Sequence, residues 1–547
     1  MCVQYLPEED PIPELISAKG AGYLIFFGKF ILKPVLMIVI LSAAGRYILT
    51  VFLTVSLAFF TISGFAATYY ISPAGNDLTG NGNIGNPWKT LFWATQTVTT
   101  IGDIIHVTAG TYTETQTCYL AKGVSIEGDG IVNTIVKSSM TGQYSAFLML
   151  ESPVNGTAGN QSISNITFDG QYVSEANYKT WMGIWVVARN NVEIHHTKII
   201  NFYNSAVIFD GNTATDPTTE PFYATGNSFH DCTALNSARI YGSSGSGILS
   251  IGGQDGMQVY NNTIIQDQRP DFKNGWPIKL WDNGWLKGCR INNNVLTKAP
   301  YVGTYPGENG DWDFAIEFFN IKGLEIDHNT IQGSIDLNYN SKGTYAYCAW
   351  IHHNTMSRTT MNTHFESGII FEFDTETAIV ENNVLNNISN GVSFNTRNGT
   401  ILSNCVIGKN MFTNLGYGIG TGTAGGILVI SEGTNNPVIT NLYIYQNTIT
   451  AAPGKEPYVG IDLQSMNLGS ANGVIIRNNI INGFTEAFIK GSSPTNMSNV
   501  VIVHNPVTGN GNNNKPLWPG GDPVKYTYDY KLGDPNDQNG IYFRSNN

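Results

Sequence analysis

The amino-acid sequence predicts an all-β solenoid, and three observations support this fold class. A short motif, in which alternating apolar residues are followed by asparagine, any residue and an apolar residue, recurs over much of the 547-residue chain. The motif returns at intervals of roughly 31 residues, a period typical of solenoid repeats. Within each copy the apolar residues alternate with period two, as in strands, and without the 3.6-residue stripe of a helical repeat.

The composition favours short strands joined by tight turns. The chain has 59 glycines and 27 tyrosines, and only 13% of its residues are charged. Glycine and asparagine tolerate left-handed backbone at turns, whereas β-branched residues favour strands. The net charge of −12 provides no basic surface for phosphate groups, so we expect no nucleic-acid partner. It also disfavours a polyanionic substrate, unless a metal ion or a local cluster of cations intervenes.

Residues 1–66 are predicted to be a targeting region. Two apolar runs cover residues 21–44 and 47–66. In the second run Arg46 precedes an apolar core that ends in small residues, which is the pattern of a secretory signal. An acidic segment is unusual before such a signal, so we expect the true translation start at Met37. In the alternative interpretation one or both runs remain as membrane anchors. The body of the chain is extracytoplasmic in either case.

The repeat is marked by one asparagine in each copy. We expect this asparagine at a bend between strands, with left-handed backbone and with its amide hydrogen-bonded from coil to coil. Weaker copies lie near Thr197 and Asn227. The clear copies place the recurring asparagine at Asn262, Asn294, Asn329, Asn354, Asn383, Asn410, Asn447, Asn479 and Asn505.

The cysteines do not form a disulfide framework. Cys2 precedes the signal, which leaves an odd number at wide spacing in the body of the chain. Cys289 and Cys405 each lie five residues before a recurring asparagine, so we predict small buried side chains there.

Four segments between residues 276 and 376 share the order apolar, charged, apolar. Their charged residues would form one column on an outer sheet face, because side chains alternate along a strand. We predict these residues as the catalytic set: Lys279, Glu317, Asp336 and Glu372.

Layers about 4.8 Å apart would separate Glu317 from Asp336 by roughly 5 Å and from Glu372 by roughly 10 Å, near the spacings of retaining and inverting glycosidases. Repulsion should raise the pKa of one carboxyl group, as a general acid requires.

A second outward column is predicted two residues further on. It would comprise Trp281, Phe319, Asn338, Asp374, Asn395 and Gln464, an arrangement on which sugar rings could stack. A neighbouring loop adds more aromatic and acidic residues. The predicted substrate-binding residues are Trp281, Trp285, Trp312, Phe319 and Asp374.

Other interpretations of these residues stay open. The charged column could be only a solvated surface. A calcium ion between Glu317, Asp336 and Glu372 is an alternative, because calcium prefers oxygen ligands; no other cofactor is indicated. The histidines of the turn motif are predicted to be structural residues of the ladder: His195, His196, His328, His352 and His353.

The start of the mature chain resembles a known family. Residues 68–77, 86–90, 102–107 and 109–112 are similar to the N-terminal cap and first coil of secreted bacterial right-handed parallel β-helix proteins, the pectate-lyase-like superfamily. The resemblance implies a capping helix at 88–99 and a parallel β-helix over 67–508. Residues 509–547 would form an irregular C-terminal cap or tail.

The resemblance implies a carbohydrate association and transfers no catalytic residue. Trp350-Ile351-His352-His353 lacks the aspartate of the pectate-lyase Trp-Ile-Asp-His motif, and the aspartates of polygalacturonases have no counterpart. We expect a secreted or cell-surface monomer that cleaves a polysaccharide, as a lyase or a glycoside hydrolase. The alternative is a non-catalytic glycan-binding surface or adhesion protein, and a structural spacer is third. Any membrane contact would be through the N-terminal segment.

Overall fold

The computed structural model divides the chain after Gly64 into two units, and all described residues belong to the second. The described residues are 66–140, 145–172, 180–211, 222–238, 247–266, 275–282, 284–298, 314–358, 367–396, 400–416, 425–431, 437–454, 459–463, 470–484, 487–490, 497–498, 500–503, 505, 507–508 and 542–543. The predicted signal, Trp312, Gln464 and most of 509–547 lie outside them. Within these ranges no helix is long and apolar enough to cross a membrane.

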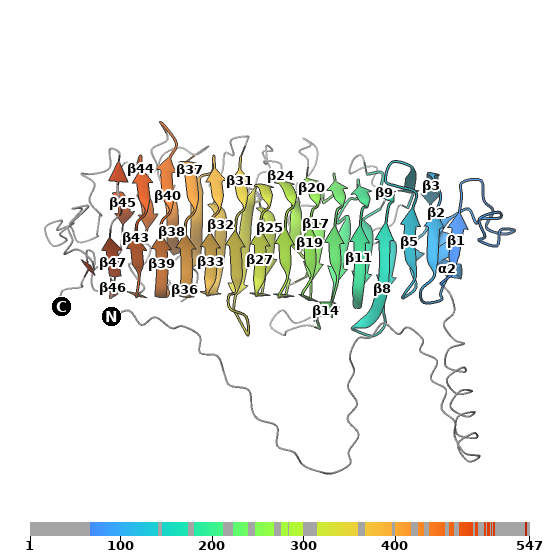
Figure 1. The fold of residues 1–547 in the computed structure, drawn as a ribbon, viewed down its shortest axis with the longest axis horizontal. Coiled ribbons are helices and arrows are strands. Elements are labelled where there is room, and N and C mark those ends of the chain that lie inside the picture. The colour runs from blue at the N-terminus through green and yellow to red at the C-terminus, as the bar shows by residue number, and fades with distance from the viewer. Residues whose placement is uncertain are drawn as a thin grey trace, which may run out of the picture. The chain divides into compact units, whose positions relative to one another are not determined.

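Three stacks of parallel strands run through the described part of the chain, and each coil contributes one strand to each stack (Figure 1). Sheet 1, which holds the predicted column, consists of β4 (Cys118–Tyr119), β7 (Ala146–Glu151), β10 (Met182–Val187), β13 (Val207–Asp210), β17 (Gly247–Gly252), β21 (Trp276–Leu280), β25 (Phe314–Phe319), β29 (Ser334–Asn340), β32 (Ser367–Glu376), β35 (Asn390–Thr396), β38 (Gly425–Ser431), β41 (Val459–Asp462) and β45 (Ala487–Lys490).

Sheet 2 follows sheet 1 in each coil. It consists of β1 (Thr68–Ile71), β2 (Ile104–Val107), β5 (Ser125–Gly128), β8 (Thr157–Ser164), β11 (Arg189–His195), β15 (Ser228–His230), β19 (Gln258–Tyr260), β23 (Arg290–Asn292), β27 (Leu324–Asp327), β30 (Ala349–His352), β33 (Ala378–Glu381), β36 (Ile401–Gly408), β39 (Val438–Tyr445), β43 (Ile475–Arg477) and β47 (Val500–Val503). β42 (Ser470–Asn472) and β46 (Met497–Ser498) extend it, and β49 (Tyr542–Phe543) pairs with β47 in antiparallel fashion.

Sheet 3 completes the coil with short strands. It consists of β3 (Gly110–Glu114), β6 (Thr134–Ser138), β9 (Thr167–Asp169), β12 (Lys198–Ile200), β16 (Thr233–Leu235), β20 (Thr263–Gln266), β24 (Val295–Lys298), β28 (Thr330–Gln332), β31 (Thr355–Ser357), β34 (Val384–Asn386), β37 (Met411–Leu415), β40 (Thr448–Ala451), β44 (Ile480–Asn482) and β48 (Val507–Thr508). At one corner β14 (Ala224–Thr225), β18 (Gln254–Asp255), β22 (Leu286–Lys287) and β26 (Ile321–Lys322) form a small fourth stack.

The core lies inside the coils, where apolar residues of successive strands stack on one another. One inward column of sheet 1 shows the pattern, because each member is fully buried and pairs with the next. Its members are Ile278, Ile316, Ile335, Ile369, Val392, Ile427 and Ile461. The period-two alternation therefore buries one side of every strand and leaves the other side for function.

The recurring asparagines form a buried hydrogen-bonded ladder, as predicted. In a typical step, Asn354 Nδ2 donates to Asn383 Oδ1 at 3.0 Å and to the carbonyl oxygen of Ile326 at 2.9 Å. The expected left-handed backbone is wrong by one position. Positive φ belongs to the preceding residue, for example 54° at His353 and 56° at Asn382. That residue turns the chain, and the asparagine holds the turn from inside.

The N-terminal end is closed by helix α2 (Leu91–Thr97), shorter than the predicted 88–99. The Thr90 side chain accepts a hydrogen bond from the Trp93 N–H, so Thr90 is the N-cap. Leu91 and Ala94 are buried against the first coils. The prediction for the cysteines is confirmed at Cys289 and Cys405, and the five cysteines of the described ranges are all buried and free.

Candidate functional site

The predicted charged column exists for three of its four members. Lys279 pairs with Glu317, and Glu317 pairs with Asp336, in parallel register on β21, β25 and β29. All three side chains point away from the core on sheet 1. The column continues through apolar and polar residues, because Asp336 pairs with Ile370 and Ile370 pairs with Ser393.

Glu372 is not in register with Asp336, and the prediction is wrong here. Glu372 pairs with Asn338, two residues further along the strand, so it lies diagonally from Asp336 on the same face. The sequence alignment placed Phe373 inward. In the structure Phe373 has φ 62° and stacks on Tyr339 at 4.3 Å, where the register shifts. The offset of Glu372 has another origin: Ile335 pairs with Ile369 and Leu337 pairs with Phe371, so the inward positions of β32 begin two residues earlier than the sequence alignment assumed.

The same shift removes Asp374 from the second column. Asp374 is exposed, and its Oδ1 accepts a hydrogen bond from the Ile401 N–H at 2.8 Å, so it secures the chain after β32. Glu372 takes the column position predicted for Asp374, between Asn338 and Asn395. The second column therefore contains Phe319, Asn338, Glu372 and Asn395, each paired with the next.

A buried ion pair anchors one end of the site. Lys279 Nζ lies 3.0 Å from Glu317 Oε2, and these residues are only 8% and 9% exposed. The same ammonium group lies 3.5 Å from the centroid of the Trp276 ring. Trp276 packs with Phe314 and Ile370 in an apolar cluster beside the carboxylates. Sequence reasoning missed this cluster, because these residues come from three different coils.

Asp336 is the electrostatically perturbed group of the face. It is 2% exposed. Burial raises the pKa of Asp336 well above its ordinary value, and repulsion by Glu372 and then by Glu317 raises it further. The hydrogen bond from Asn338 Nδ2, at 3.2 Å, and the charge of Lys279 act in the opposite direction. Asp336 therefore holds a proton at a pH at which an ordinary aspartate has lost it.

Several acceptor oxygens of this face are buried and have no hydrogen-bond partner among the described residues. They are Asp336 Oδ1, Asn338 Oδ1, Ser393 Oγ and Asn395 Oδ1. Each unsatisfied buried acceptor costs about 1–3 kcal/mol. The four atoms come from β29 and β35, the two strands that flank β32. They form a surface suited to a ligand that donates hydrogen bonds.

The predicted aromatic residues are divided between two places. Phe319 ends β25 in the second column. Trp281 lies against earlier coils of sheet 1. Its Nε1 donates to Asp210 Oδ2 at 3.0 Å, and its ring centroid lies 5.5 Å from that of Trp185. Trp285 lies at the corner before β22, with Lys322 Nζ 6.0 Å from its ring centroid. Among the described members of this set, Phe319 therefore lies in a strand of sheet 1 and Trp281 directly follows one.

The alternative considered for Glu317, Asp336 and Glu372, a shared calcium ion, finds no support in their geometry. Within the described ranges these residues do not present one oxygen each, all within 4.8 Å of one another. Glu317 is instead paired with Lys279. We therefore derive no role for calcium from these three carboxylates.

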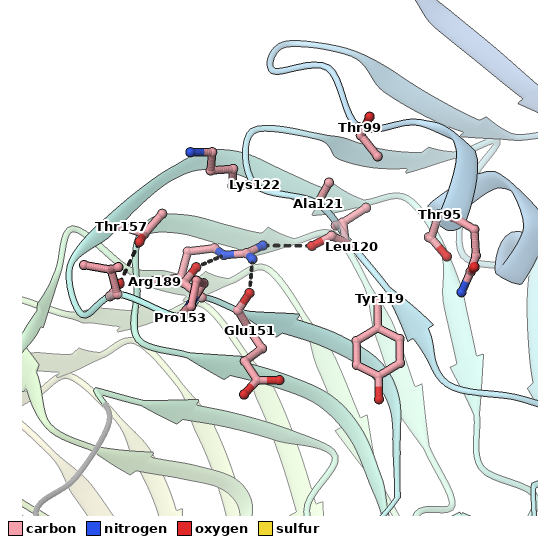
Figure 2. Close-up of a pocket in the computed structure, with 13 residues that line it drawn as sticks. Thr95, Thr99, Tyr119, Leu120, Ala121, Lys122, Glu151, Pro153, Thr157 and Arg189 are labelled. Atoms are coloured by element: carbon pink, nitrogen blue, oxygen red, sulfur yellow. Dashed lines mark hydrogen bonds between the residues drawn. The ribbon is translucent and has the colours of Figure 1, made fainter.

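Apart from the face of sheet 1, a hollow of about 610 Å³ lies between the end of α2 and the first coils. Sequence reasoning missed it. Figure 2 shows Arg189 at its wall, with hydrogen bonds to the Leu120 and Glu151 carbonyl oxygens at 3.0 and 2.6 Å. Arg189 also donates to Ser152 Oγ and Gln161 Oε1. Burial lowers the pKa of Arg189 to about 10. Its donors bind protein acceptors, so it fastens this corner and offers little to an anion.

Known proteins were compared with the chain. No family model matches it, and no curated protein matches it. Among solved structures it is similar to the Agl-KA catalytic domain, with 15% identity over 71% of this chain and 64% of that one, and a TM-score of 0.48.

Two further solved structures are similar to the chain, with comparably low identity and TM-score. A mannuronic acid specific polysaccharide family 6 lyase from human gut microbiota has 13% identity, coverage of 76% and 87%, and a TM-score of 0.41. The tailspike protein of E. coli bacteriophage HK620, in complex with pentasaccharide, has 11% identity, coverage of 76% and 74%, and a TM-score of 0.43. The chain spans less than two thirds of the Agl-KA domain.

This chain is a right-handed parallel β-helix. The predicted fold class is confirmed, with the parallel pairings of the three sheets as its direct observation. Identities this low concern the fold, and one fold hosts many functions.

Proposed function

We propose that this chain is a secreted, carbohydrate-active protein that hydrolyses a polysaccharide on the outer face of sheet 1. The observation that carries the proposal is Asp336, a buried carboxyl group whose pKa is raised by burial, Glu372 and Glu317. A carboxyl group with a raised pKa can hold the proton that it then donates to the oxygen of a departing sugar. A second carboxylate on the same face supplies the base or nucleophile that such hydrolysis requires.

The three carboxyl groups receive different roles. Asp336 is the proposed general acid. Glu317 is held by Lys279 at 3.0 Å, and its proximity raises the pKa of Asp336, so Glu317 helps to retain the proton on Asp336. Glu372 is more exposed than the other two and lies diagonally from Asp336, so it is the proposed base that activates water.

The acceptor-rich surface supports a neutral glycan. Asn338, Ser393 and Asn395 present buried oxygens that hydroxyl groups of a sugar could satisfy. Aromatic Phe319 borders the same column. β-Elimination from a uronic sugar needs a cation beside the sugar carboxylate. The Lys279 ammonium group is already paired with Glu317, so hydrolysis is favoured over elimination.

One observation favours the binding-only alternative. Asp336 and Asn338 are only 2% and 1% exposed, which is little for groups that must reach a glycosidic bond. A glycan-binding surface without chemistry needs only the outer atoms of the face. The two functions differ in whether a product is formed.

A product screen tests the proposal. The full-length protein is incubated with neutral and uronic polysaccharides, with and without calcium. Reducing ends report hydrolysis, and absorbance at about 235 nm reports the unsaturated product of elimination. We expect reducing ends without that absorbance, on a neutral substrate. Unsaturated product would overturn hydrolysis, and binding without any product would support the alternative.

Isosteric variants then assign the roles. Asp336→Asn and Glu372→Gln should each lower kcat at least about 100-fold, because each removes a proton-transfer group. Glu317→Gln should lower kcat less and shift the pH profile to lower pH. Glu127→Gln is the matched control, because Glu127 is an exposed residue of β5 in sheet 2. Equal losses in the control variant would show that the effect is not specific to this face.

A further inference from the structure

Histidines gather along one edge of sheet 2, where each strand meets the turn to sheet 3. Six of the nine histidines of the chain lie there. Each occupies the last strand residue or the residue after it. The histidines lie in two pairs of adjacent coils, those of β11 and β15 and those of β27 and β30. We call the following residues the histidine edge: His195, His196, His230, Asp231, Asp327, His328, His352 and His353.

The turn itself brings consecutive side chains together. The second residue of each pair has left-handed backbone, for example φ 55° at His328 and 54° at His353. Its side chain therefore swings to the same side as its neighbour. His352 Nδ1 lies 2.9 Å from His353 Nδ1, and His328 Nδ1 lies 2.6 Å from Asp327 Oδ2.

Two clusters of the edge have the same composition. Each contains three histidines, one aspartate and one glutamate from two adjacent coils, in the order Glu193, His195, His196, His230, Asp231 and Glu325, Asp327, His328, His352, His353. In both, the glutamate of the first coil contacts a histidine of the second. Glu325 Oε1 lies 3.2 Å from His352 Nε2, and Glu193 Oε1 lies 2.7 Å from His230 Nε2.

We propose that Asp327, His328 and His352 bind one divalent transition-metal ion such as zinc. Their ligand atoms all lie within 4.8 Å of one another, and no other such group of His, Cys, Asp or Glu occurs in the part of the chain that the structure describes. Around zinc, neighbouring nitrogen and oxygen ligands lie roughly 3.3 Å apart, so small side-chain rotations bring these atoms to bonding distance. Imidazole nitrogens select zinc and related metals over calcium.

Glu325 prepares His352 for this role. When His352 Nε2 carries the proton and donates it to Glu325 Oε1, Nδ1 keeps a lone pair for a metal. His353 Nδ1 lies 2.9 Å from His352 Nδ1, beside the group of three ligand atoms, and is not a member of that group. His328 and His353 are exposed, so an ion can enter from solvent.

Arg290 sets a limit on the strength of the site. Its Nε and a terminal nitrogen donate to the Asp327 carboxylate, each at 2.8 Å. The guanidinium offsets the charge that would attract a cation. It also fixes the Asp327 carboxylate in place, with Oδ2 toward His328. The selectivity of the site for zinc over calcium then depends on its nitrogen ligands more than on its net charge.

The test is a zinc titration of the tag-free, full-length protein against a competing chromophoric chelator. We expect one equivalent bound above the background of surface sites, and no displacement by excess calcium. His328→Asn and His352→Asn should each weaken binding at least tenfold. Zinc should also raise the melting temperature of the parent protein, because it binds only the folded chain. Neither readout depends on the proposed hydrolysis.

His196→Asn is the matched control. It changes an exposed histidine of the other cluster, in which no three ligand atoms lie within 4.8 Å of one another. We expect it to keep the zinc equivalent. The proposal is overturned if the parent protein binds no zinc, if His328→Asn binds as tightly as the parent, or if His196→Asn loses binding equally. Because the side chain of His328 is 53% exposed, its variant should fold even if His352→Asn does not.

Discussion

Asp336 and Glu317 occupy directly paired positions on the outer side of neighbouring parallel strands, and both are nearly buried. Like charges at such positions destabilise a sheet. The structure relieves the repulsion in two ways, because Lys279 pairs with Glu317 at 3.0 Å and the pKa of Asp336 is raised so that it keeps a proton. This relationship makes stability and activity depend on pH in a defined direction.

Asp336→Asn should change the pH dependence of stability. The raised pKa means that the folded chain binds a proton that the unfolded chain releases above about pH 3.9. Stability of the parent protein therefore falls as pH rises, by at most about 1.4 kcal/mol per pH unit from this group, until the folded carboxyl group ionises. The Asp336→Asn variant has no carboxyl group at this position, so its stability does not fall with pH for this reason. Urea unfolding should show the variant gaining on the parent above pH 4 and matching it below pH 3.5.

Glu127→Gln provides the comparison for that measurement, because Glu127 is exposed on another sheet. Its stability should follow the parent protein at every pH. A constant difference between Asp336→Asn and the parent, independent of pH, would contradict the raised pKa of Asp336.

Lys279→Met should destabilise the fold by about 3–5 kcal/mol, because it leaves Glu317 as a buried charge without its cation. The double variant Lys279→Met/Glu317→Gln should recover most of this loss, since neither partner is then charged. Urea unfolding of the parent, both single variants and the double variant gives the coupling energy. If the double variant is less stable than Lys279→Met, the ion pair at 3.0 Å is not the source of the loss.

Asn354→Ala should destabilise the chain by about 3 kcal/mol or more. The change removes the donor to Asn383 and Ile326 and the acceptor for Asn329, so buried groups lose partners on both neighbouring coils. Asn382→Gly is the matched control at the turn, where φ is 56° and glycine is well accommodated. Thermal unfolding should show a change within about 0.5 kcal/mol for this control. Equal losses would mean that the turn matters more than the ladder.

The cysteines of the coils should be unreactive in the folded protein. Burial raises the pKa of Cys232 to about 12, that of Cys289 to about 11 and that of Cys405 to about 12. Because the thiolate is the reactive form, a maleimide at pH 8 should label no more than Cys2 in native protein. All six cysteines should be labelled in urea. Rapid labelling of several thiols under native conditions would contradict the burial of these side chains.

The position of Glu372 depended on the register between coils, which local pattern could not predict: Ile335 pairs with Ile369, two residues before Phe371. The alternation of Ile335-Asp336-Leu337 correctly predicted an inward, outward, inward order, since Ile335 and Leu337 are fully buried. At Phe371-Glu372-Phe373 the alternation failed only for Phe373, because Phe373 adopts positive φ and leaves the strand alternation. A phenylalanine rarely adopts that conformation, so sequence propensity gave no warning. The stacking partner Tyr339 comes from the preceding coil.

By itself, the sequence determined the repeat, the class of strand and the asparagine ladder, because these follow from local alternation and from one residue type returning at a fixed period. It also identified Lys279, Glu317 and Asp336 as neighbours. Tertiary structure alone decided that Glu372 pairs with Asn338, that Asp336 is buried enough to hold a proton, and that six histidines share one edge. Register and desolvation depend on contacts between coils, and residues far apart in the sequence make those contacts.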